Sequence, residues 1–254
     1  MPDRRGKFVS RAGEKLDAAL EAFGVDVAGC VCADFGCNVG GFTDCLLRRG
    51  AAKVYAVDTG YGALAWRLRK DPRVVVMERT NALYAPIPEP VDLVAVDVAW
   101  TPQKVIVPAA MRWLGWGAQD GQAGRPVCED AGGDSARPGE AVSPRRPTAG
   151  PGRTHLGRGA RLTPGGGSIV SLLKPHYELA KIQGRKPAAP LSPLDAREVC
   201  LEVCRRLNGL GCIVRSVMQS ILHGKGGNVE FLLLIGPPQD FPSSRGLPRK
   251  RGPG

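Results

Sequence analysis

The segment 33–44 combines glycines and acids in a spacing that suits the binding of a cofactor. Asp34 precedes Gly36, and Gly40 and Gly41 follow after three residues, so the spacing is G-x-x-x-G-G. Gly36 lets the backbone turn sharply and approach a ligand closely, because glycine has no Cβ atom. The paired glycines would let the next helix begin near the same ligand. The segment therefore predicts a ligand-binding turn at the end of a strand.

A second acid, Asp58, lies about 20 residues after Gly36 and ends the next apolar run. A carboxylate there can accept hydrogen bonds from the two hydroxyls of a ribose, in a dinucleotide or in S-adenosylmethionine. A dinucleotide site prefers G-x-G-x-x-G, and an acid such as Asp34 would repel the pyrophosphate. The same acid would attract the cationic amine of an aminoacyl group. The pattern favours S-adenosylmethionine, while a loop that merely connects, with Asp58 as a helix N-cap, stays open.

Alternating apolar runs and short helical patterns position these residues. Strands are predicted at 30–35, 53–57, 74–78, 91–98, 168–173, 212–218 and 229–235, and helices at 14–23, 42–49, 63–69, 103–114 and 193–207. The alternation predicts β-α-β units, and hence an α/β fold whose mostly parallel, seven-stranded sheet is covered by helices on both faces. The last two strands flank a glycine-rich turn at 224–228, so we expect them to pair as antiparallel neighbours.

Two segments lack the apolar residues that a packed element needs. Residues 117–164 are rich in Gly, Pro and Arg, and residues 237–254 are rich in Pro and end in basic residues. Neither segment can bury enough surface to offset the entropy cost of ordering it. We therefore expect one domain over residues 1–236, interrupted by a disordered insertion at 117–164, and a disordered basic tail.

The composition indicates a basic protein that acts away from membranes. Lys and Arg number 35 against 24 Asp and Glu, a formal net charge of +11. Such a charge is typical of proteins that bind nucleic acid, although it can also merely aid solubility. The chain has no apolar run long enough to cross a membrane and no visible signal peptide, which favours the cytoplasm and predicts no membrane partner. The cysteines form no C-x-x-C pair, so we expect reduced thiols and no metal site.

Short motifs along the chain share a recognisable pattern. They read V-S-R-A-G-E-K-L at 9–16, D-F-G at 34–36, G-G-F-T-D at 40–44, V-Y-A-V-D at 54–58, E-R-T-N-A at 78–82, L-K-P-H-Y-E at 173–178 and G-N-V-E-F-L at 227–232. Together they resemble the motifs of the haemolysin A-type (TlyA) rRNA methyltransferases, within the wider FtsJ-like ribose 2′-O-methyltransferases. The resemblance spans roughly residues 8–236. It implies a Rossmann-like class I methyltransferase fold, S-adenosyl-L-methionine as cofactor, and ribosomal RNA or a ribosomal subunit as substrate.

The chain also departs from the pattern of this family. The family usually carries an N-terminal S4 RNA-binding domain, and this sequence starts just after the place where that domain would end. We therefore expect weaker RNA binding or help from a partner protein. The S-F-I-S that follows the fourth-strand acid in the family reads Ala99-Trp100-Thr101-Pro102 here, and the insertion at 117–164 is not typical.

FtsJ-like enzymes use a Lys-Asp-Lys-Glu tetrad, which the resemblance places at Lys15, Asp97, Lys174 and Glu230. Asp97 and Lys174 each end an apolar strand, where ligands bind in this fold class. In this assignment Lys174 stabilises the charge that develops on a ribose hydroxyl, or accepts its proton, while the two acids orient the lysines. A solvated lysine, a helix cap or an edge-strand charge are the alternatives for these positions.

The predicted cofactor site comprises Asp34, Gly36, Gly40, Gly41, Phe42, Asp58, Thr80, Asn81 and Asp97. Thr80 and Asn81 follow the third strand and could contact adenine, or could serve only to form a turn.

Four other functions stay open: a non-catalytic RNA-binding relative, a methyltransferase acting on another substrate, a small-molecule Rossmann enzyme, and a pore-forming haemolysin. Intact Asp34, Asp58 and tetrad positions argue against the first, and the lack of a membrane-spanning or strongly amphipathic segment argues against the last.

Overall fold

The computed structural model describes residues 7–99, 101–116, 160–161, 167–184 and 189–237. Its helices and strands are α1 (Arg11–Ala22), β1 (Val25–Asp26), β2 (Val31–Phe35), α2 (Gly41–Arg48), β3 (Lys53–Val57), α3 (Trp66–Arg69), β4 (Val74–Met77), β5 (Leu93–Val96), α4 (Gln103–Trp113), β6 (Ala160–Arg161), β7 (Ser168–Leu173), α5 (Pro175–Gln183), α6 (Pro193–Gly209), β8 (Ile213–Gln219) and β9 (Phe231–Gly236). A short 3-10 turn at Lys225–Gly227 precedes β9.

Seven strands form one sheet in the order β4-β3-β2-β5-β7-β9-β8. All neighbours pair in parallel except β9, which is antiparallel to both β7 and β8. The mostly parallel, seven-stranded sheet and the antiparallel pairing of the last two strands are thereby confirmed. The strand order reverses between β2 and β5, and ligands in such sheets bind at the carboxyl ends of the strands beside this switch point.

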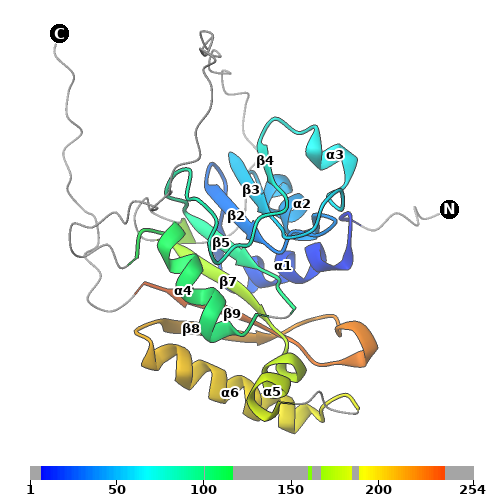
Figure 1. The fold of residues 1–254 in the computed structure, drawn as a ribbon, viewed down its shortest axis with the longest axis vertical. Helices are drawn as coiled ribbons and strands as arrows, with labels where there is room; N and C mark the ends of the chain where they lie inside the picture. Colours follow the sequence, from blue (N-terminus) through cyan, green and yellow to red (C-terminus); the bar gives the residue numbers. More distant parts are fainter. Residues whose placement is uncertain (1–6, 100, 117–159, 162–166, 185–188, 238–254) are drawn as a thin grey trace, which may run out of the picture.

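Helices cover both faces of the sheet, as predicted (Figure 1). One core joins the sheet to α1 and α2 and includes Leu16, Leu20 and Phe42. The other joins it to α4 and α6 and contains Trp113, the largest fully buried side chain of the described residues. The Trp113 and Phe35 rings form a T-shaped pair with a centroid distance of 5.3 Å. The central strands are buried on both faces, which explains why their sequences are almost continuously apolar.

Helix α5 and the short strands β1 and β6 were not predicted from the sequence. Helix α5 follows directly after β7, where no helix was predicted; Pro175 stands at its first position, where the missing N–H costs nothing and the fixed φ suits a helix. In addition, Ala160 and Arg161 belong to the predicted disordered insertion, yet they form β6, which pairs in parallel with β1. The rest of the insertion and residues 238–254 of the predicted tail lie outside the described residues.

None of the helices in the described ranges has the length and apolar character that a membrane crossing needs. None of the cysteines in the same ranges forms a disulfide bond in the structure, and the reduced state of the thiols stays a prediction. These ranges also contain no group of three or more His, Cys, Asp or Glu side chains that could hold a metal ion.

Candidate active site

The carboxyl ends of β2 and β5 meet at Gly36 and Asp97. Gly36 has a φ of +83°, and a Cβ atom there would lie 2.5 Å from the carbonyl oxygen of Asp97. The Gly36 N–H donates to the carbonyl of Val57 at the end of β3, at 2.8 Å. Only glycine combines this backbone conformation with so close an approach. The turn predicted to bind a cofactor therefore lies at the switch point of the sheet.

The four tetrad residues form two ion pairs. Lys174 directly follows β7, and its Nζ lies 2.5 Å from Oδ1 of Asp97, which directly follows the neighbouring strand β5. Lys15 of α1 pairs with Glu230, which directly precedes β9. The antiparallel register places Leu173, the last residue of β7, opposite Phe231, the first residue of β9. Lys174, which follows β7, and Glu230, which precedes β9, therefore lie at the same edge of the sheet. The fold thus gathers residues from four distant segments at one edge.

The two ion pairs differ in their exposure. The side chains of Lys174 and Asp97 are 15% and 21% exposed, so a substrate can reach them. Lys15 and Glu230 are only 8% and 4% exposed as residues. A buried ion pair of this kind needs both partners, because either charge alone would be costly to bury. The outer pair is therefore suited to contact a substrate, and the inner pair to hold the site together.

Asp34 lies inside β2 and is fully buried. Its Oδ2 accepts hydrogen bonds from the backbone N–H of Thr43 at 2.9 Å and from its hydroxyl at 2.7 Å. Its Oδ1 is buried without a hydrogen-bond partner in the described part of the chain. Burial, helped by the charges of Asp97 and Asp58, raises the pKa of the Asp34 carboxyl to about 7, although the Thr43 hydrogen bonds act to lower it. An adjacent cation would satisfy this group.

Asp58 follows β3 and links two loops at the same edge. Its Oδ2 accepts from the Asn38 N–H at 2.8 Å and its Oδ1 from the Gly60 N–H at 2.7 Å. Asp58 caps no helix of the described chain, since α3 begins after Ala65. No cation in the described ranges lies within ion-pair distance of it, so this fixed, partly exposed carboxylate can accept hydrogen bonds from hydroxyl groups.

The paired glycines serve packing between helices. A Cβ atom on Gly40, whose φ is +97°, would overlap the side chain of Leu68, and one on Gly41 would overlap the Ser10 hydroxyl. The Phe42 side chain lies in the core beneath α1. Protein side chains therefore fill the space beside these residues, and a contact between them and a cofactor stays a prediction.

Thr80 and Asn81 form a turn beside Asp58. The Thr80 N–H donates to the carbonyl of Asp58 at 2.9 Å, and the Thr80 hydroxyl donates to the carbonyl of Glu78 at 2.9 Å. The Asn81 side-chain oxygen accepts from the Leu83 N–H at 3.0 Å. The turn role is therefore present, and the predicted contact with adenine stays a prediction.

Two buried residues in or near the site were given no role from the sequence. Thr43, in the G-G-F-T-D motif, holds Asp34. Glu178, the last residue of the L-K-P-H-Y-E motif, is buried and accepts a hydrogen bond from the Gln103 N–H at 2.7 Å, at the start of α4. Both stood in recognised motifs, which was the available signal, but their partners come from other elements and could not be read from spacing.

The chain matches the FtsJ-like methyltransferase family model over residues 8–236. The 16S/23S rRNA (cytidine-2′-O)-methyltransferase TlyA of Mycobacterium tuberculosis is 37% identical over 238 residues, which cover 92% of this chain and 70% of the relative.

Two solved structures have a similar fold. A protein described as a "putative hemolysin" from Lactococcus lactis superimposes with a TM-score of 0.66 at 26% identity, covering 91% of this chain and 89% of that one. The N-methyltransferase NodS from Bradyrhizobium japonicum superimposes with a TM-score of 0.51 at 14% identity, covering 90% and 86%. At that identity the likeness to NodS shows the fold alone.

Proposed function

The chain belongs to the FtsJ-like methyltransferase family, and we propose that it transfers a methyl group from S-adenosyl-L-methionine to a ribose 2′-hydroxyl of ribosomal RNA. The observation that carries this proposal is the Lys174–Asp97 ion pair at the switch point, with the Lys15–Glu230 pair beside it. The M. tuberculosis relative, named for 2′-O-methylation of cytidine in 16S and 23S rRNA, supports the choice of substrate. Such a substrate would place the enzyme in the cytoplasm.

Two groups at the switch point fit the proposed cofactor. The unpartnered, buried Oδ1 of Asp34 suits a cationic amine, and the fixed carboxylate of Asp58 suits the hydroxyls of a ribose. When bound, the cofactor would supply an electrophilic methyl group carried on a sulfonium. Because Gly36 has no side chain, the backbone at this turn can approach the cofactor closely.

The protein's contribution to the reaction is alignment and charge. The 2′ oxygen must stand in line with the methyl carbon, about 3–3.5 Å away. Lys174 would stabilise the negative charge that develops on this oxygen, and the hydroxyl proton would pass to solvent water as the methyl group is transferred. Asp97 accepts a hydrogen bond from Lys174 and so fixes the direction of its ammonium group. The Lys15–Glu230 pair holds the neighbouring strand end in place.

Methyl transfer to purified ribosomal subunits tests the proposal. The protein is incubated with labelled S-adenosylmethionine and unmodified small or large subunits, and the labelled nucleotide is mapped. We expect label on a ribose of one or both RNAs, and adding cell extract tests the predicted partner protein. If calorimetry shows that the cofactor binds but no subunit is labelled with or without extract, the substrate is wrong. If no heat of binding is seen with folded protein, the cofactor is wrong.

A further inference from the structure

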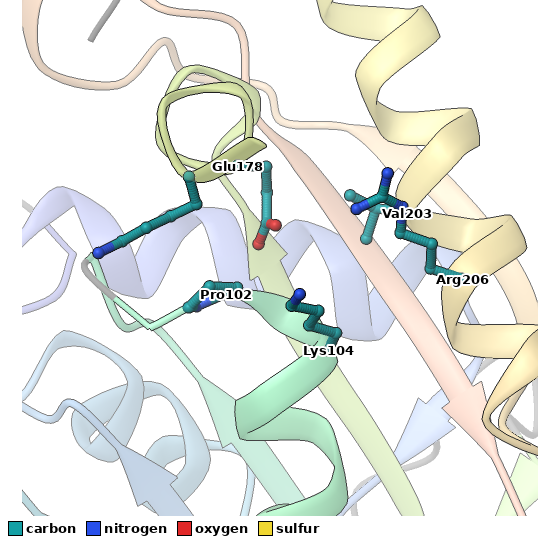
Figure 2. A pocket seen from close by; sticks show the side chains of 6 residues that line it. Pro102, Lys104, Glu178, Val203 and Arg206 are labelled. Carbon is teal, nitrogen blue, oxygen red and sulfur yellow. The ribbon is translucent and has the colours of Figure 1, made fainter. Parts of the chain in front are cut away.

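A pocket of about 320 Å³ lies between α4, α5 and α6, outside the residues that the proposed function uses. It is lined by Pro102, Lys104, Glu178, Lys181, Val203 and Arg206, and we call it the α5 pocket. Figure 2 shows the Glu178 carboxylate, the Lys104 ammonium and the Arg206 guanidinium directed toward the same space. Its volume is at the small end of the range for pockets that bind ligands.

The α5 pocket combines one buried acid with an exposed basic rim. Glu178 is buried, and one of its oxygens accepts the Gln103 N–H. Its other oxygen forms no hydrogen bond with any residue in the described ranges, so it can accept one from a ligand. Lys104, Lys181 and Arg206 are exposed around it. The pocket therefore offers a hydrogen-bond acceptor inside and positive charge at its mouth.

The α5 pocket adjoins the proposed catalytic lysine. A second, narrower hollow is lined by Lys174 and shares Pro102, Glu178 and Lys181 with the pocket. Lys174 occupies the position directly before α5, and Glu178 follows it by about one helical turn. That turn corresponds to about 6 Å along the helix axis. A polymer whose reacting group lies at Lys174 therefore has its neighbouring unit within reach of the pocket.

We propose that the α5 pocket binds the nucleotide adjacent to the methylated one in the RNA substrate, an inference that rests on the proposed function. The base donates an N–H to the free oxygen of Glu178, and the phosphate lies against the basic rim. A bare phosphate fits less well, because Glu178 would repel it. A nucleotide fits both parts, since it carries N–H donors and an anionic group at separate ends. The base must be unpaired for its edge to reach Glu178.

Arg205 and Arg206 provide a matched pair of variants. Both form ion pairs with Glu202 on α6, at 2.9 Å and 2.7 Å, but only Arg206 lines the pocket. We compare Arg206→Ala with Arg205→Ala in binding to ribosomal subunits at several salt concentrations. Arg206→Ala is expected to weaken binding and to lower the slope of log affinity against log salt by about 1, as for one lost phosphate contact. Equal affinities and slopes for the two variants would overturn the proposal.

Glu178→Gln tests the base contact. Glutamine keeps an acceptor for the Gln103 N–H, so α4 stays capped, but its amide competes poorly with a carboxylate for the base. We expect the KM for the RNA to rise by about tenfold, with kcat and cofactor affinity unchanged. A lower kcat at unchanged KM would instead show that Glu178 only supports the fold, and would overturn the base contact.

The two measurements separate this inference from the proposed function. Binding to ribosomal subunits is measured without methyl transfer. If the wild-type protein binds the subunits but does not methylate them, the proposed function is contradicted. The proposed role of the α5 pocket is still supported in that case if Arg206→Ala weakens binding. Methyl transfer that Arg206→Ala and Glu178→Gln leave unchanged contradicts the pocket alone. Cytidine monophosphate that binds tightly at the pocket, with RNA binding unaffected by these variants, would show a small-molecule site and overturn the proposal.

Discussion

Lys15 of α1 pairs with Glu230, which directly precedes β9 and lies 215 positions away in the sequence, and both residues are buried. The first helix of the described chain is thereby joined to its last strand, beside Lys174. Because a buried charge is stable only when it is paired, this contact requires both ends of the chain to be in place. It connects the stability of the fold to the geometry of the proposed active site.

Glu230→Gln is expected to lower the free energy of unfolding by about 3–5 kcal/mol, because Lys15 would remain buried without an opposite charge. Urea denaturation measures this change. The double variant Lys15→Met, Glu230→Gln is expected to recover most of the lost stability, since neither charge remains, while methyl transfer stays low. A single variant as stable as the wild type would show that the buried pair does not stabilise the fold.

Gly224→Ala is expected to disturb the Lys15–Glu230 ion pair without changing either of its residues. The φ of Gly224 is −67°, which alanine adopts readily, but a Cβ atom there would overlap the Glu230 carboxylate. We expect a loss of about 1–3 kcal/mol in the free energy of unfolding, together with slower methyl transfer. Gly209→Ala in α6 is the control, because nothing lies within 4 Å of its new Cβ atom. Similar losses in both variants would exclude the contact with Glu230 as the cause.

Lys174→Ala is expected to reduce kcat by at least about 100-fold and to leave the affinity for S-adenosylmethionine unchanged. In the proposed site Lys174 contacts the substrate hydroxyl, whereas the groups proposed to bind the cofactor, Asp34 and Asp58, lie in β2 and directly after β3. Labelled methyl transfer and calorimetry measure the two quantities. Lys53→Ala is the control, since Lys53 pairs with Glu89 at the start of β3, away from the carboxyl ends of the strands. Full turnover by the Lys174→Ala variant would contradict the proposed role of Lys174 in methyl transfer.

The fold could be predicted because its central strands are buried on both faces and therefore read as continuous apolar runs. Strands β3 and β7 have the predicted bounds, 53–57 and 168–173. The same runs placed Asp97 and Lys174 at strand ends, so their meeting at one edge of a parallel sheet followed from the fold class. Their ion pair, 77 positions apart in sequence, agrees with that reasoning.

The remaining features depend on contacts between elements, which spacing does not encode. The paired glycines were predicted to let a helix begin near a ligand, which stays a prediction; the positions of Leu68 and Ser10 beside Gly40 and Gly41 could not be read from the sequence. The contact of Asp34 with a cofactor stays a prediction, but its hydrogen bonds from Thr43 and its complete burial depend on other elements and could not be read from the sequence. Helix α5 begins at Pro175, shortly after β7. A proline at this place is equally typical of a loop and of the first residue of a helix, so the sequence did not distinguish the two.

Asp34 is expected to make the stability depend on pH. Its pKa is about 7 in the folded protein against an ordinary value of 3.8, so between these values the folded state holds a proton that the unfolded state has released. The stability from this group is therefore present at low pH and is lost as the pH rises through 7. From pH 5 to pH 8 we expect the free energy of unfolding to fall by about 2–3 kcal/mol, measured by urea denaturation.

Asp34→Asn is the control for this pH dependence. Asparagine keeps an acceptor for Thr43 and cannot ionise, so the fall in the free energy of unfolding between pH 5 and pH 8 should be smaller by the part that Asp34 causes. If the variant and the wild type lose the same stability over this range, Asp34 is not the group responsible. S-adenosylmethionine offers a second comparison. A cationic amine beside Asp34 would favour the ionised carboxyl, so saturating cofactor should reduce the fall in the wild type. A fall of the same size with cofactor would show that the amine binds elsewhere.

Gly36→Ala is expected to destabilise the protein more than Gly62→Ala. Both glycines have a positive φ, +83° and +75°, so alanine costs about 1–2 kcal/mol of backbone strain at each. At Gly36 the new Cβ atom would also lie 2.5 Å from the carbonyl oxygen of Asp97, whereas nothing lies within 4 Å at Gly62. Relieving that overlap separates β2 from β5, which should cost about 1–3 kcal/mol more and weaken cofactor binding. Urea denaturation and calorimetry measure both effects, and equal losses in the two variants would show that strain alone explains why glycine is needed at the switch point.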